Sequence, residues 1–77
     1  MILFRSERVQ RVAHFQRLFE EVAETRDPEK LRLLEDYYTS GLWLEDYEAD
    51  ERGELPLDLK RGVLSQDALY DLLEGER

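Results

Sequence analysis

The stretch "SERVQRVAHFQRLFEEVAETRDPEK", Ser6 to Lys30, decides the fold class. Its apolar residues recur at spacings of three and four, which is the pattern of one side of an amphipathic helix. They are Val9, Val12, Phe15, Leu18, Phe19, Val22 and Ala23. Asp27 is a favourable N-cap and Pro28 suits the first helical position. We therefore expect one helix from Ser6 to about Thr25 and a second from Pro28 to about Tyr38.

Glycines and prolines divide the next part of the chain. Gly41 in "TSG" favours the end of the second helix, because glycine adopts the left-handed conformation easily. Gly53 and Pro56 bound a third helix of roughly ten residues. The segment "LPLDLKRG" predicts a single turn from Pro56 to Gly62, with its leucines Leu57 and Leu59 available for burial.

A last short helix is expected after Ser65, which is a favourable N-cap. Leu69, Leu72 and Leu73 form its apolar side, and Leu64 can pack against Leu69. The sequence shows neither sustained two-residue alternation nor a hairpin signal. We predict an all-α fold, a small bundle of about four short-to-medium helices that forms a single helical domain over residues 1–77.

Composition excludes several classes of function. The chain has 77 residues, no cysteine, and 19 acidic against 11 basic residues, for a net charge of -8. This charge argues against binding of nucleic acid, which depends on neutralising phosphates with Lys and Arg. No apolar run is long enough for a membrane span, and "MILF" lacks the long apolar region of a signal peptide. We expect a soluble, cytoplasmic protein without a membrane partner.

The charge is distributed unevenly along the chain. Four arginines, Arg5, Arg8, Arg11 and Arg17, stand against one acid in residues 1–19, whereas residues 45–58 are strongly acidic. The two regions could attract each other within the fold or across a homodimer, or the acidic region could meet a basic protein partner. Charge of this kind steers association without identifying the partner.

The acidic stretch "EDYEADERGELP", Glu45 to Pro56, follows the only tryptophan. Trp43 and Tyr47 are four residues apart and share one side of the predicted helix, while Asp46 and Asp50 share an adjacent side. We predict that these four residues bind a protein partner, since aromatic residues dominate binding hot spots. A competing interpretation is that Lys60, Arg61 or the N-terminal arginines hold the two aspartates inside the fold.

Carboxylates at this density could also bind a divalent cation. Asp46, Glu48 and Asp50 resemble the first three ligand positions of an EF-hand loop, but Glu51 replaces its turn glycine and Leu57 its last ligand. His14, the only histidine, has no zinc ligand three or four residues away, so we expect it to be exposed or at a boundary. The sequence therefore predicts no metal ligand set, no catalytic residue and no cofactor.

Residues Leu34 to Glu76 contain a tyrosine pair in "LEDYYTSGLWLEDYEADERGEL", a Trp-x-x-Asp-Tyr segment and the run "DLKRGVLSQDALYDLL". In this combination they resemble a bacterial family described only as domain of unknown function 4298. The first 33 residues match only in being helical. The resemblance implies a small helical cytoplasmic protein and supplies no activity, cofactor or partner.

These observations predict a non-enzymatic interaction module that presents an acidic aromatic surface to a protein partner of unknown identity. The alternative is a divalent-metal-binding or hydrolytic protein that uses the same carboxylates.

Overall fold

The computed structural model describes residues 6–75, and this range forms four α-helices and one 3₁₀ turn, without strands. The elements are α1 (Glu7–Thr25), α2 (Pro28–Thr39), α3 (Leu42–Glu51), η1 (Gly62–Leu64) and α4 (Gln66–Glu74). The predicted all-α fold class is therefore confirmed. The "MILF" segment and Arg5 lie outside the described residues. No helix in residues 6–75 is both long enough and apolar enough to cross a bilayer.

Side-chain caps begin three of the helices, as the sequence predicts for Asp27 and Ser65. The Ser6 hydroxyl accepts a hydrogen bond from the Val9 amide at 3.1 Å, and Asp27 accepts one from the Glu29 amide at 2.9 Å. The Ser65 hydroxyl accepts one from the Ala68 amide at 3.3 Å. Each cap satisfies an amide that the helix itself leaves unpaired, and contributes about 1 kcal/mol.

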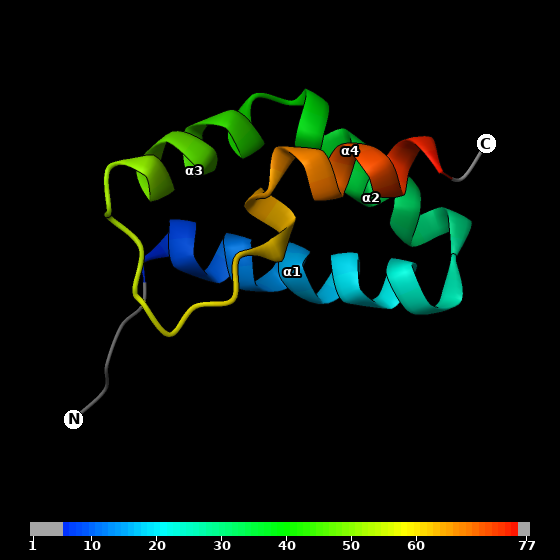
Figure 1. Cartoon of the computed structure of the whole chain (residues 1–77), viewed down its shortest axis with the longest axis horizontal. Helices are drawn as coiled ribbons and strands as arrows, with labels where there is room; N and C mark the ends of the chain where they lie inside the picture. Colours follow the sequence, from blue (N-terminus) through cyan, green and yellow to red (C-terminus); the bar gives the residue numbers. More distant parts are fainter. Residues whose placement is uncertain (1–5, 76–77) are drawn as a thin grey trace.

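Gly41 separates α2 from α3. Its φ of 95° lies in the left-handed region, which a residue with a Cβ atom adopts only with strain. The chain therefore changes direction here without a long loop, and α2 and α3 return together along α1 (Figure 1). This return places the inner side of α3 opposite the N-terminal part of α1.

Buried apolar residues from every element form one cluster between the helices. α1 contributes Val9, Val12, Leu18 and Val22, as its periodicity predicts, and Ala23 is exposed. The remaining members are Leu34, Tyr37, Trp43, Leu55, Val63, Leu64 and Leu69. Leu64 and Leu69 are both buried in this cluster, and the packing of one on the other stays a prediction.

The segment between α3 and α4 differs from the prediction. A hydrogen bond from the Leu59 amide to the Pro56 carbonyl, at 3.2 Å, closes a turn there, but the helical turn comes later, at Gly62–Leu64. Leu57 was predicted to be available for burial and is instead 98% exposed. The turn reverses the backbone between Leu55 and Leu59, so it directs Leu57 outward while Leu55 enters the core.

Val63 of η1 is held by side chains from two helices. The Gln16 Oε1 atom of α1 accepts a hydrogen bond from the Val63 amide at 2.8 Å, and the Trp43 Nε1 atom of α3 donates one to the Val63 carbonyl at 2.9 Å. Buried backbone groups outside regular structure need such partners, because an unpaired group costs about 1–3 kcal/mol. These two bonds fix η1 between α1 and α3, which positions α4.

Candidate functional site

The buried carboxylate of Asp46 is the centre of a polar network that joins three helices. Its side chain is 0% exposed. Oδ1 accepts hydrogen bonds from Arg8 Nε at 3.1 Å and Arg11 Nη2 at 2.6 Å. Oδ2 accepts bonds from Arg11 Nε at 2.8 Å and the Tyr37 hydroxyl at 2.7 Å. Arg8 and Arg11 come from α1 and Tyr37 from α2, so one carboxylate of α3 connects α1, α2 and α3.

Charge and hydrogen bonding keep this network ionised. Burial alone would raise the pKa of Asp46, but hydrogen bonds from Arg11 and Tyr37 and the arginine charges outweigh burial and lower that pKa. The hydrogen bond to Asp46 raises the pKa of Arg11. Burial, followed by the hydrogen bond to Asp46, raises the pKa of the Tyr37 hydroxyl far above its ordinary value. Asp46 is therefore an anion, and Tyr37 a hydrogen-bond donor, at neutral pH.

Asp50, one turn after Asp46, holds the loop that follows α3. Its Oδ1 atom accepts a hydrogen bond from Arg61 Nη1, and Arg61 Nη2 donates to the Pro56 carbonyl. Arg61 Nε also donates to the Leu59 carbonyl at 3.3 Å. A single guanidinium thus ties the Pro56–Leu59 turn to the end of α3. The competing interpretation of the sequence named Lys60, Arg61 or the N-terminal arginines as the bases that hold the two aspartates. Arg61 holds Asp50, and the N-terminal arginines Arg8 and Arg11 hold Asp46.

Trp43 and Tyr47 stack against each other inside the same helix. Their ring centroids are 5.1 Å apart with planes inclined by 16°, and Tyr38 of α2 meets the Trp43 ring edge-on at 5.0 Å. Trp43 is buried and Tyr47 half-buried. Aromatic pairs of this kind add about 0.5–1.5 kcal/mol beyond their buried area. The tryptophan therefore anchors α3 to α2 and η1.

The structure divides the four predicted partner-binding residues into two groups. Trp43 and Asp46 are buried, and both form hydrogen bonds within the protein. Tyr47 and Asp50 are half-buried and keep part of their side chains at the surface. Partner binding by these four residues stays a prediction. Of the four, Tyr47 and Asp50 are the ones whose side chains keep surface that a partner could contact.

The outer side of α3 carries residues that the fold leaves accessible. Leu44 is 50% exposed, and Glu48 and Glu51 follow it at spacings of four and three, so the three side chains form one row. Glu45 is also exposed and approaches Arg8 at 4.0 Å. We call these four residues, Leu44, Glu45, Glu48 and Glu51, the outer face of α3. It combines a leucine with three carboxylates.

The carboxylates that the structure describes show no arrangement that suits a metal ion. Among residues 6–75, no group of three or more His, Cys, Asp and Glu side chains is placed to hold one. The alternative function predicted from the sequence would use Asp46 and Asp50, whose oxygens already face arginines. His14 is exposed, as expected, and lies edge-on to Phe15 at 5.0 Å.

Sequence reasoning missed two residues that build the site. Tyr37 entered the sequence analysis only as part of the tyrosine pair, but its hydroxyl donates a hydrogen bond to Asp46 and its ring stacks on Phe15 at 4.0 Å. Gln16 lies among apolar residues of α1 and is buried. Its side-chain oxygen accepts a hydrogen bond from the Val63 amide, and its side-chain nitrogen donates one to Glu20. The sequence did carry a signal for the centre of the site, Asp46. Trp43, Asp46 and Ala49 recur every three residues, which puts Asp46 on the buried side of α3.

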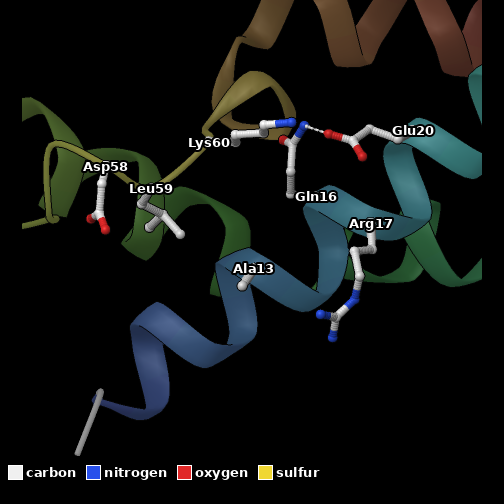
Figure 2. Close-up of a pocket in the computed structure, with 7 residues that line it drawn as sticks. All are labelled: Ala13, Gln16, Arg17, Glu20, Asp58, Leu59 and Lys60. Carbon is white, nitrogen blue, oxygen red and sulfur yellow. Dashed lines mark hydrogen bonds between the residues drawn. The ribbon is translucent and has the colours of Figure 1, made fainter. Parts of the chain in front are cut away.

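A separate hollow of about 330 Å³ lies between α1 and the loop before η1. Figure 2 shows Leu59 and Lys60 of the loop facing Ala13 and Gln16 of α1, with the Gln16 amide hydrogen-bonded to Glu20 at 2.8 Å. Arg17 and Asp58 complete its lining. The hollow shares no residue with the Asp46 network of Arg8, Arg11 and Tyr37.

Comparison with protein-family models identifies a family for this chain. The model of the family described as Domain of unknown function (DUF4298) matches residues 6–77. This range extends the resemblance seen in residues 34–76 through the whole of α1, including Arg8 and Arg11. No curated protein and no solved structure is significantly similar to the chain.

Proposed function

We propose that this chain, which belongs to the DUF4298 family, is a non-enzymatic interaction module that binds a basic segment of another protein on the outer face of α3. The observation that carries the proposal is the division of α3 into two sides. On its inner side, Trp43 and Asp46 are buried and form hydrogen bonds within the protein. Its outer side keeps an exposed leucine within a row of carboxylates.

Charge complementarity supports a basic partner. The protein carries a net charge of -8, and several of its bases are engaged internally: Arg8 and Arg11 with Asp46, Arg61 with Asp50, and Lys30 with Glu21. The three arginines neutralise the inner carboxylates Asp46 and Asp50, so the negative charge that remains on α3 lies mainly on its exposed glutamates. Such a surface attracts Lys and Arg side chains from a distance and repels nucleic acid and anionic membranes.

Leu44 and Tyr47 give the surface an apolar component. They are three residues apart on α3, so the exposed leucine adjoins the half-buried ring. Charge alone gives fast but weak association, whereas an apolar contact at the centre adds affinity. The partner that fits best is a helix with Lys or Arg around a leucine-like side chain. The contacts of the inner side fix α3 before binding, so less conformational entropy is lost when the partner binds.

The experiment is an NMR titration. A synthetic helical peptide with leucines and lysines at three- and four-residue spacings is added to isotope-labelled protein. We expect the amide signals of Leu44–Glu51 to shift, and salt to weaken the effect. A control peptide with glutamate in place of lysine should produce no shifts. Glu48→Lys should weaken binding, whereas Glu24→Lys, the same charge change at an exposed position of α1, should leave it nearly unchanged.

Two results would contradict the proposal. One is a set of shifts centred on Glu20, Glu21 and Glu24, because it would mean that the peptide follows any acidic region. The other is equal binding by Glu48→Lys and Glu24→Lys. Either outcome would leave the roles of Trp43 and Asp46 in stability untouched, since those depend on internal contacts.

A further inference from the structure

The loop between α3 and η1 presents an apolar side chain on a fixed turn. Leu57 is 98% exposed, although Leu55, two residues earlier, is buried. The turn around it is closed by the hydrogen bond from the Leu59 amide to the Pro56 carbonyl at 3.2 Å, and the Arg61 guanidinium bonds the carbonyls of Pro56 and Leu59. Single exposed leucines are common on surfaces, but this one stands on a backbone that is already ordered.

The hollow beside α1 adjoins this leucine. Asp58 and Leu59, the two residues after Leu57, both contribute to its lining, and Ala13 of α1 adds a second apolar surface. Figure 2 shows Leu59 directed toward Ala13 across the hollow. A protruding leucine and a hollow that could receive one therefore lie next to each other on the same surface.

Charge at the hollow differs from charge elsewhere on the protein. Two basic side chains, Arg17 and Lys60, and two acidic ones, Glu20 and Asp58, line it. Two copies of a chain with a net charge of -8 repel each other over most of their surfaces. They can approach most readily where the local charge is balanced, and a surface carrying both signs can be complementary to a second copy of itself.

We propose that the chain forms a two-fold symmetric dimer in which Leu57 of each copy enters the hollow beside α1 of the other. In a two-fold interface the same surface serves both partners, so a protrusion beside a recess is used twice. The fixed turn lowers the entropy lost when Leu57 becomes ordered in the recess. This contact lies apart from the outer face of α3 and does not depend on the proposed function.

Sedimentation at a series of concentrations tests the dimer with matched variants. The wild-type chain should show a monomer–dimer equilibrium. Leu57→Asp should raise the dimer dissociation constant about tenfold or more, because it removes one buried leucine from each half of the contact. Leu44→Asp, which makes the same change at an exposed leucine of α3, should leave the dissociation constant unchanged.

Charge variants provide a second arm. Lys60→Glu makes the hollow acidic and should weaken the dimer, whereas Arg32→Glu, the same charge change at an exposed position of α2, should weaken it far less. Far-UV circular dichroism verifies that the variants keep their helices. A chain that stays monomeric at every concentration overturns the proposal. So does a dimer that Leu57→Asp leaves intact, because another surface would then hold it together.

Discussion

Replacing Asp46 by asparagine removes the charge from the buried network and keeps the shape of the side chain. The carboxylate accepts two hydrogen bonds on each oxygen, from Arg8 and Arg11 on Oδ1 and from Arg11 and Tyr37 on Oδ2. An amide offers one oxygen and one N–H₂ group, so at least one arginine N–H would face another donor, whereas the Tyr37 hydroxyl can also accept. The variant therefore loses the charge and at least one of the arginine hydrogen bonds.

The loss can be estimated from burial. Removing one partner of a buried ion pair costs about 3–5 kcal/mol. The lower end applies here, because the side chains of Arg8 and Arg11 are 34% and 23% exposed, and water can solvate them after the change. We expect a loss of about 3 kcal/mol from a chain whose whole stability, at its length, is about 4–12 kcal/mol.

Urea unfolding measures this loss, with the helix signal in circular dichroism at 222 nm as the readout. With a slope of about 1 kcal/mol per molar urea, the unfolding midpoint of Asp46→Asn should fall by about 3 M. The matched control is Asp50→Asn, whose carboxylate is more exposed and pairs with Arg61 alone among the described bases, and which should lose about 1 kcal/mol. Tyr37→Phe, which deletes a single hydrogen bond to the carboxylate, should lose about 1.5 kcal/mol. A loss for Asp46→Asn no greater than that for Asp50→Asn would refute the reasoning.

Three further outcomes follow from the same contacts. The pKa of Asp46 is lower in the folded protein than its ordinary value of 3.8. The stabilisation that Asp46 contributes is therefore complete above pH 3.8 and disappears as the pH falls through the folded pKa. The urea midpoint, measured over a series of acid pH values, should show this dependence in the wild type and not in Asp46→Asn. Trp43→Phe leaves the Val63 carbonyl without its indole donor and should cost about 1–3 kcal/mol, read from circular dichroism because the fluorophore is lost; an unchanged midpoint would mean that this bond is unimportant. Gly41→Ala forces a Cβ atom into a backbone with φ of 95° and should cost about 1 kcal/mol in the same assay, and a stabilising effect would contradict the left-handed turn.

Local signals predicted the elements of this fold well. The apolar spacing of α1 identified its buried side, and Asp27, Pro28 and Ser65 mark helix beginnings where the structure has them. These features depend on residues within one or two turns of each other. A sequence displays such neighbours directly, so the helix boundaries could be predicted to within a few residues.

The polar centre could be predicted only in part, because its contacts join distant parts of the chain. Asp46 meets arginines 35 and 38 residues earlier, and nothing local distinguishes it from its exposed neighbours except its three-residue spacing from Trp43. The attraction between the basic start and the acidic middle of the chain was visible in the sequence; the choice of Asp46 over Asp50 as its target was not. That choice depends on the turn at Gly41, which sets the angle of α3 above α1.

Leu57 is an apolar residue whose exposure the sequence did not predict. The alternating leucines of "LPLDL" suggested that the segment turns its apolar side chains inward, and a tertiary contact decided otherwise. Arg61 draws the Pro56 and Leu59 carbonyls together, so the turn points Leu57 away from the core. Hydropathy cannot report this, because the donor lies outside the apolar pattern and acts on backbone atoms.

The central claim is that the inner carboxylate of α3 is used inside the fold and the outer carboxylates remain available. A double-mutant cycle between Arg11 and Asp46 tests it most directly, with urea unfolding of Arg11→Gln, Asp46→Asn and the combined variant. If the two side chains act on each other as their 2.6 Å and 2.8 Å contacts indicate, the combined loss will be smaller than the sum of the single losses by about 1.5 kcal/mol or more. Single losses that simply add would contradict the claim and place Asp46 outside the network that holds the three helices.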